Sequence, residues 1–145
     1  MAANYPNVQY VAGNCLHPES FKDVLQDVNG VIHTVGALVD GKGERSYQAL
    51  NCDTTVKVAR ELDQIVASRE GEEKGNIVMI SSAKAPPFLP AYLSTKIEAE
   101  NYILKNCDNL NKTIIRPGFI VNAEHRSWSV PLSYGVDFLY RLNQF

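Results

Sequence analysis

Tyr92 and Lys96 are the two residues of this chain whose types and spacing suggest chemistry most directly. On a helix, residues four apart lie one turn apart on the same face. A phenol, with an ordinary pKa near ~10, is a poor base and a weak acid at neutral pH, but a nearby ammonium favours its phenolate form. Proton exchange with a substrate hydroxyl or carbonyl then becomes feasible, and the same lysine can hydrogen-bond ribose hydroxyls. By itself this spacing is common, and it usually means a partly buried ring beside a solvated amine.

The chain around this pair alternates between predicted strands and predicted helices. Short apolar runs rich in β-branched residues predict strands at Val8–Ala12, Val31–Val35, Asn76–Ile80 and Thr113–Arg116. Apolar residues at spacings of three and four predict helices at 17–28, 46–68 and 91–105, with a further helix in the tail from Pro131. Strands separated by helices indicate an α/β fold with a doubly wound parallel sheet, in which function lies in the loops after the strands.

Composition excludes several classes of protein. The 145 residues suit one domain, and 14 Lys plus Arg against 16 Asp plus Glu give a net charge of −2, which argues against a nucleic-acid-binding surface. No apolar run approaches the ~20 residues that span a membrane. The three cysteines are far apart, so we expect no disulfide framework, and Cys15 with His17 supplies too few ligands for a metal site.

Five short motifs then occur in a characteristic order. They are VIHTVGA at 31–37, the asparagine that ends YQALN at 47–51, IVMISSA at 77–83, YLSTKIEAE at 92–100 and TIIRPGF at 113–119. Together they resemble the extended and atypical short-chain dehydrogenase/reductase superfamily from about Val8 to Asn122, which implies a Rossmann-like fold and NAD or NADP as cofactor. Within it, VIHTVGALVD, the short proline loop before Tyr92 and RPGFIVNAEHR resemble an atypical branch linked to mitochondrial coenzyme Q biosynthesis. Rossmann-type accessory subunits of mitochondrial NADH dehydrogenase are more distantly similar.

The resemblance implies roles for individual residues. Tyr92 would be the proton donor, and Lys96 would bind the ribose and favour the phenolate. The hydroxyl that orients the substrate in the extended enzymes falls at Ala83 here, so Ser82 is the remaining candidate. This loss favours a second hypothesis, in which the protein is a non-catalytic scaffold or assembly subunit that keeps only the fold.

The resemblance also implies a set of residues around the cofactor. These are Asn14 against the adenine, His33 and Gly36 under the ribose, Ser81 at the end of its strand, and Pro117, Gly118 and Phe119 on the nicotinamide side. Asn14 stands where relatives hold an aspartate, so that contact loses its charge. His33 is more simply a core histidine on a buried strand, and Pro117-Gly118 is equally well a strand stop.

A larger departure precedes all of these motifs. The Gly-rich turn that cradles the pyrophosphate is absent from the sequence, as is the strand carrying the residue that selects NAD or NADP. We therefore expect residues 1–145 to form one partial domain, lacking the first two strands, with 126–145 the start of a truncated C-terminal portion. Val31–Val35 should then be an edge strand that self-associates, binds a protein partner or pairs with Val8–Ala12. A mitochondrial location follows from the resemblance alone.

Overall fold

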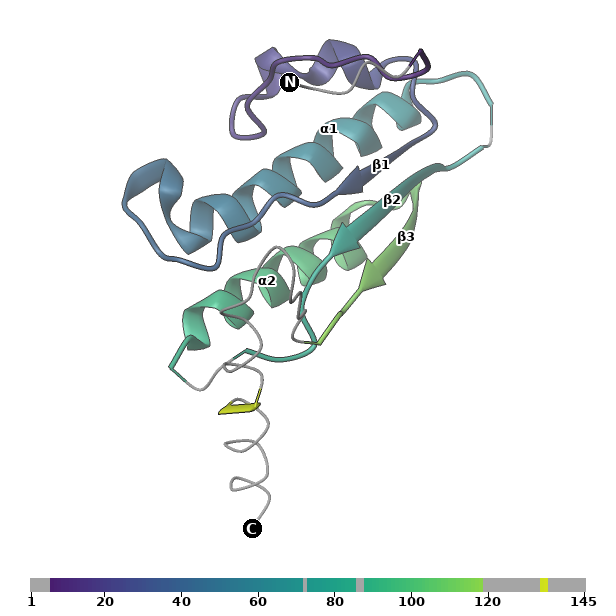
Figure 1. Ribbon diagram of the computed structural model, residues 1–145. Helices are drawn as coiled ribbons and strands as arrows, with labels where there is room; N and C mark the ends of the chain where they lie inside the picture. Colours follow the sequence, from purple (N-terminus) through teal and green to yellow (C-terminus); the bar gives the residue numbers. More distant parts are fainter. Residues whose placement is uncertain (1–5, 72, 86–87, 119–133, 136–145) are drawn as a thin grey trace.

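The computed structural model describes residues 6–71, 73–85, 88–118 and 134–135. Their centre is a parallel sheet of three strands in the order β1-β2-β3, in which β1 is Gly30–His33, β2 is Gly75–Ile80 and β3 is Leu110–Ile115. The connections contain the α-helices α1, Thr54–Ala67, and α2, Pro90–Asn106 (Figure 1). Shorter helical segments are η1 (Pro18–Ser20), η2 (Lys22–Leu25), η3 (Gly43–Arg45) and the π-helix η4 (Gln48–Asp53). The expected α/β architecture, a partial Rossmann-like fold, is confirmed.

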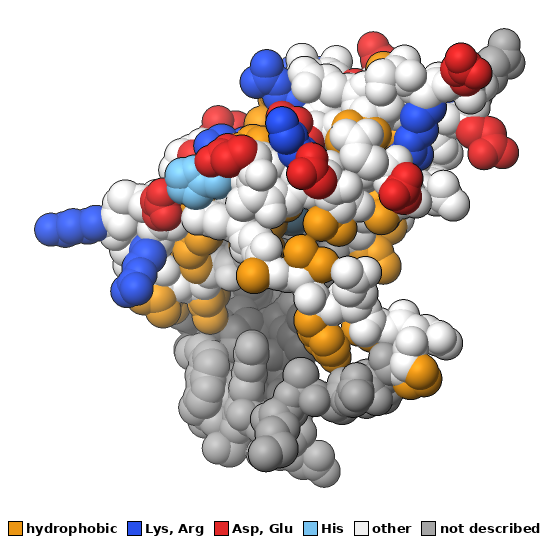
Figure 2. Space-filling model, turned by 90° about the horizontal axis from the view of Figure 1, so that it is seen from above, with side chains coloured by type: hydrophobic (Ala, Val, Ile, Leu, Met, Phe, Trp, Pro, Cys, Tyr) orange, Lys and Arg blue, Asp and Glu red, His pale blue; other side chains and the backbone are white. Residues whose placement is uncertain are grey.

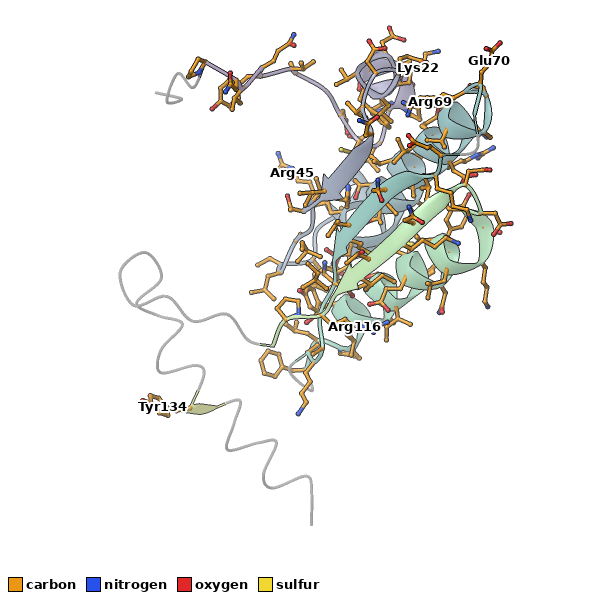
Figure 3. The ribbon with its side chains drawn as sticks, turned by 90° about the vertical axis from the view of Figure 1, so that its right-hand side faces the viewer. Lys22, Arg45, Arg69, Glu70, Arg116 and Tyr134 are labelled. Atoms are coloured by element: carbon orange, nitrogen blue, oxygen red, sulfur yellow. The ribbon has the colours of Figure 1, made fainter. Side chains whose placement is uncertain are left out.

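Both α-helices lie against the same face of the sheet, as Figure 3 shows. The register explains which side chains they cover, because residues paired across parallel strands share a face. Ile77 pairs with Val31, and Met79 with His33, and these four side chains point toward the helices. Ile77 and Met79 are 1% exposed, and they pack with Leu62 of α1 and Ile103 of α2 in the core.

Gly75 marks the closest approach of α1 to the sheet. A Cβ on Gly75 would lie 2.7 Å from Val66 Cγ2 and 3.0 Å from Leu110 Cδ2. Because a real side-chain atom there would collide with both, the glycine lets α1 pack closely on the beginning of β2 and β3.

The other face of the sheet is apolar and much less covered by the described residues. Ile32 is 72% exposed and Ile115 46% exposed, while Val78 and Ile80 between them are half-buried. Figure 2 shows hydrophobic side chains gathered in the lower part of the view and charged side chains in the upper part. β1 lies at the edge of the sheet, as expected.

We expect the chain to self-associate through β1, and Ile32→Lys to weaken that association at least about tenfold, because a charge on an edge strand opposes strand pairing. Sedimentation equilibrium over a concentration series measures the effect. Ile97→Lys is the matched control, since Ile97 is 44% exposed on α2, away from the edge. A wild-type chain that stays monomeric throughout, or equal effects of the two substitutions, would contradict the expectation.

The predicted strand Val8–Ala12 is wrong. Residues 8–12 have no regular secondary structure and are exposed, so they do not pair with β1 either. A run of β-branched and aromatic residues becomes a strand only where a neighbouring strand offers hydrogen-bond partners. None of the described strands lies beside this segment. The predicted helix at 17–28 is also shorter than expected: it forms η1 and η2, separated at Phe21, although Pro18 does begin it.

The long helix predicted at 46–68 is observed as η4 followed directly by α1. Its predicted inner stripe is confirmed for Tyr47, Thr54, Val58, Leu62 and Ile65, all of which are buried. β3 begins earlier than predicted, at Leu110, whose amide donates to Cys107 O in the turn after α2. The tail helix and the portion from 126 lie outside the described residues, apart from Tyr134 and Gly135.

Candidate functional site

Lys96 lies at the centre of a polar cluster beneath the carboxyl ends of the strands. It is 6% exposed, and its Nζ donates to Ile80 O at 3.2 Å. The Nζ atom also lies 5.6 Å from the centroid of the Tyr92 ring. Burial lowers the pKa of the Lys96 ammonium, and the nearby Glu100 carboxylate opposes that shift. The proximity of ammonium and phenol inferred from their spacing is therefore observed.

Tyr92 is held in the first turn of α2. The helix begins with Pro90 at a position that tolerates proline, because the first helical amides have no partner within the helix. Thr95 Oγ1 donates back to Ala91 O at 2.9 Å and to Tyr92 O at 3.1 Å. The Tyr92 ring packs edge-on against Tyr47, with centroids 5.9 Å apart.

Gly36 and Asn51 complete the cluster on the side of β1. Asn51 is fully buried; its Oδ1 accepts from Ala37 N at 2.8 Å and its Nδ2 donates to Ala37 O at 3.2 Å. A Cβ on Gly36 would lie 2.9 Å from Asn51 Oδ1 and 3.2 Å from Lys96 Nζ. The absence of a side chain at Gly36 thus lets the Lys96 ammonium and the Asn51 carboxamide approach the backbone closely.

The π-helix η4 presents Asn51 toward this loop. Single π turns are rare inside α-helices, and those that occur often lie at functional sites. The sequence motifs include the asparagine of YQALN but do not assign it to the site, because the change in helical period is not visible in the apolar spacing. The sequence feature that could have identified Asn51 is its position at the end of YQALN, the second of the five ordered motifs.

An ion pair between the buried Glu100 and the half-exposed Arg116 lies one helical turn below Lys96. Glu100 is 4% exposed and accepts from Arg116 Nε at 3.1 and 3.0 Å, and from Arg116 Nη2. Burial by itself would raise the pKa of Glu100, but the hydrogen bonds from Arg116 outweigh it and the pKa is lowered. The nearby Ser81 hydroxyl also lowers the pKa of Glu100. Glu100 is therefore the negative charge that faces Lys96 from the protein interior.

His33 has the character of a core histidine. It is 5% exposed, with its Nε2 3.4 Å from Thr54 Oγ1. Burial, together with the positive charge of Lys96, lowers the pKa of His33 to about 4. The ring is neutral at physiological pH and supports the sheet beneath Gly36.

Several predicted site residues lie elsewhere or point away. The Ser82 hydroxyl donates to Lys84 O at 2.7 Å, so the Ser82 side chain is directed along its own loop. Asn14 Oδ1 accepts from Leu16 N at 2.9 Å, so this side chain closes a local turn in an exposed segment. Pro117 O accepts from Ala83 N at 2.9 Å, and this bond brings the loops after β2 and β3 side by side.

Gly118 follows in open space, since no described atom lies within 4 Å of the position that a Cβ would take there, and Phe119 lies outside the described residues. Among residues 6–71, 73–85 and 88–118, no three His, Cys, Asp or Glu side chains gather in a way that would hold a metal ion. No helix in the same ranges is long and apolar enough to cross a bilayer.

Residues 44–144 match the model of an NAD-binding family described as male sterility protein. The chain belongs to this family. The match begins in η3 and includes the π turn, α1, β2, α2 and β3, and therefore Asn51, Ser81, Tyr92, Lys96 and Glu100. The relationship to extended short-chain dehydrogenases/reductases inferred from the motifs is confirmed.

A curated relative of the chain is MIOREX complex component 2 of Saccharomyces cerevisiae. The two are 24% identical over 179 residues, which covers 95% of this chain and 64% of the relative. The chain therefore spans less than two thirds of the length of this relative.

The observed cluster fits the nicotinamide-ribose end of the cofactor that the NAD-binding family implies. An ammonium has three donors, and the described contacts of Lys96 Nζ include one hydrogen bond, to Ile80 O. Gly36 brings bare backbone against both polar groups, because a Cβ there would lie 2.9 Å from Asn51 Oδ1 and 3.2 Å from Lys96 Nζ. Residues 1–145 include no Gly-rich turn of the kind that cradles the pyrophosphate.

Proposed function

We propose that the protein binds NAD or NADP through the nicotinamide-ribose end, at the cluster of Gly36, Asn51, Tyr92 and Lys96. The observation that carries the proposal is the convergence of the Lys96 ammonium, the Tyr92 ring and the Asn51 carboxamide near the bare backbone of Gly36. Polar donors and bare backbone at the carboxyl ends of parallel strands are where ligands bind in open α/β sheets. Membership of an NAD-binding family supports the same ligand class.

When bound, the nicotinamide supplies or accepts a hydride. The donors of Lys96 Nζ would hold the ribose hydroxyls of the bound nucleotide. Tyr92 would hold the proton that a substrate oxygen gains or loses. The negative charge of Glu100 opposes the lowering of the Lys96 pKa by burial. This makes the protein a reductase-like nucleotide-binding protein with Tyr92 as its proton donor.

A comparison of whole and half cofactors tests the proposal. In a chain of residues 1–145, reduced nicotinamide mononucleotide should bind within about threefold of NADH and NADPH, because these residues include no Gly-rich turn for the pyrophosphate. Isothermal titration at millimolar ligand measures all three affinities. Absence of saturable binding at these concentrations contradicts the proposal.

Lys96→Met should abolish this binding, since it keeps the length of the side chain and removes its donors. Lys105→Met is the matched control, because Lys105 is exposed in the last turn of the same helix. Equal losses in the two variants would mean that the effect comes from helix stability or net charge, and the proposed site would then be wrong.

At the level of the cell, we infer an accessory role in mitochondrial coenzyme Q biosynthesis. The likeness of VIHTVGALVD and RPGFIVNAEHR to an atypical, mitochondrial branch of the superfamily supports it. The similarity to a protein named as a component of the MIOREX complex supports work within a multi-protein assembly. Depletion of the protein should lower cellular coenzyme Q, and a normal coenzyme Q content would contradict this role.

A non-catalytic scaffold is the second candidate function, and two observations favour it. Ala83 stands where the extended enzymes have a hydroxyl, and Ser82 Oγ is already bonded to Lys84 O. The edge strand β1, with Ile32 72% exposed, offers a surface on which a partner could pair. In this case protein binding would survive substitution of Tyr92 and would be lost in Ile32→Lys.

A further inference from the structure

Two neighbouring loops expose large apolar side chains to water. The loop after β1 carries Leu38 and Val39, which are 43% and 79% exposed, and the loop after β2 carries Phe88, which is 64% exposed. The two loops lie side by side, since all three residues line the same open hollow. We call these three side chains the apolar tips. Exposed apolar side chains that gather in one place mark a surface where another molecule binds.

The loop after β1 holds Val39 in its exposed position. Tyr47 OH donates to Leu38 O at 2.7 Å, and Tyr47 N donates to Asp40 Oδ1 at 2.8 Å. Both neighbours of Val39 are therefore bonded to Tyr47, which is itself buried. A binding partner gains the contact with Val39 at a small cost in conformational entropy, because this part of the chain is already ordered.

Two cationic side chains lie beside the apolar tips. Lys42 and Arg45 are exposed in the turn of η3, where Arg45 N donates to Lys42 O at 3.2 Å. A Cβ on Gly41 would lie 2.8 Å from Arg45 Cβ, so the chain folds back and brings Arg45 close to the backbone that follows Val39. Figure 2 keeps the left side of Figure 1, where η3 lies, and shows basic side chains projecting there beside hydrophobic ones.

The charges of this loop differ in what they contact. The carboxylate of Asp40 accepts from Tyr47 N, and Glu44 Oε1 lies 3.1 Å from His17 Nε2. Within residues 6–71, 73–85 and 88–118, by contrast, the side chains of Lys42 and Arg45 form neither an ion pair nor a hydrogen bond. The two cations are therefore available to an anion from outside the protein, although the net charge of the chain is −2.

We propose that the apolar tips, together with Lys42 and Arg45, dock on the surface of an anionic lipid bilayer. The apolar tips enter the boundary between headgroups and acyl chains, which contributes roughly 25 cal/mol per Å² of apolar surface removed from water. The long side chains of Lys42 and Arg45 reach the lipid phosphates above that boundary. This docking goes beyond the proposed function, because it needs neither nucleotide nor Tyr92.

Vesicle flotation tests the docking. The chain should partition at least about tenfold more strongly onto phosphatidylcholine vesicles with about 30 mol% phosphatidylglycerol than onto phosphatidylcholine alone, since each cation near an anionic surface adds about fivefold. The chain with Lys96→Met should partition as the wild type does, so docking and nucleotide binding can fail separately. Absence of the wild-type chain from the floated anionic vesicles overturns the proposal.

The double variant Lys42→Gln/Arg45→Gln should lose this preference for anionic vesicles. Lys22→Gln/Arg60→Gln is the matched control, because it changes the net charge equally and both residues are exposed. Lys22 lies on η2, whose Leu25 O accepts from Arg69 beyond the far end of α1 from η3 (Figure 3). Equal losses in the two double variants would mean that net charge alone attracts the chain, and the proposed surface would be wrong.

Val39→Gln should weaken partition onto both kinds of vesicle by about three- to tenfold, because an amide replaces the apolar tip. Val24→Gln is its control, since Val24 is 45% exposed on η2. The same effect of the two substitutions contradicts the proposal. It is also wrong if Val39→Gln instead lowers the mass of the lipid-free chain in sedimentation equilibrium without changing partition, since the apolar tips would then join copies of the chain.

Discussion

Replacing Tyr92 with phenylalanine should lower the turnover of a neutral carbonyl compound by about 10²- to 10⁴-fold, because the substitution removes the proton donor and keeps the ring. The affinity for reduced nicotinamide mononucleotide should stay within about twofold, since Lys96 and Gly36 are unchanged. Single-turnover oxidation of the reduced nicotinamide, at saturating concentrations of both ligands, separates the chemical step from binding. This result rests on the proposed function.

The control for this experiment is Tyr102→Phe. Tyr102 lies on the same helix and packs partly buried against the core, so its variant reports any general effect of losing a hydroxyl from α2. A Tyr92→Phe chain that folds and turns over at the wild-type rate would contradict the redox hypothesis. The scaffold hypothesis would then be favoured.

Acidification from pH 7 to pH 5 should reduce the free energy of unfolding by about 2 kcal/mol through His33 alone. Burial and the positive charge of Lys96 lower the pKa of His33 from 6.5 to about 4. Above pH 6.5 both the folded and the unfolded chain hold this ring neutral, and between pH 6.5 and 4 only the unfolded chain binds the proton. Stability is therefore complete above pH 6.5 and falls as the pH approaches 4, with a total loss of about 3 kcal/mol.

Urea denaturation at several pH values between 7 and 5 measures this dependence. His33→Gln should flatten the slope, because glutamine keeps a polar partner for Thr54 and does not titrate in this range. His17→Gln serves as the comparison, since the side chain of His17 is 49% exposed near Glu19 and Glu44. If His33→Gln left the slope as steep as the wild type, protonation of His33 would not be the cause.

The sequence predicted well those elements for which the apolar periodicity and the residues that mark the ends indicate the same secondary structure. The strand at 76–80 and the helix at 91–105 have both, and β2 and α2 differ from them by only a residue at either end. Val8–Ala12 has the composition of a strand and failed, because strand formation depends on a neighbour that composition does not contain. Periodicity likewise could not distinguish the helix expected at 17–28 from the two short 3₁₀ turns that form.

For the candidate site, the spacing of Tyr92 and Lys96 was sufficient to predict that they meet. Asn14 and Ser82 were assigned by resemblance, and local hydrogen bonds hold both elsewhere. Asn51 could not be assigned from spacing, because a π turn shifts the residues that follow it by part of a helical turn. Short polar side chains can form hydrogen bonds within their own loops, and these bonds compete with contacts to a ligand. Such competition is difficult to predict from the sequence.

The ion pair between Glu100 and Arg116 has a thermodynamic consequence for the whole site. Arg116 immediately precedes Pro117 and Gly118, where the chain leaves the sheet, while Glu100 contributes to the charge felt by Lys96. A ligand that binds Lys96 more tightly when Glu100 is ionised must, by reciprocity, favour the ionised form of Glu100 by the same free energy. Ligand binding at Lys96 and the ionisation of the carboxylate that accepts from Arg116 are therefore thermodynamically coupled.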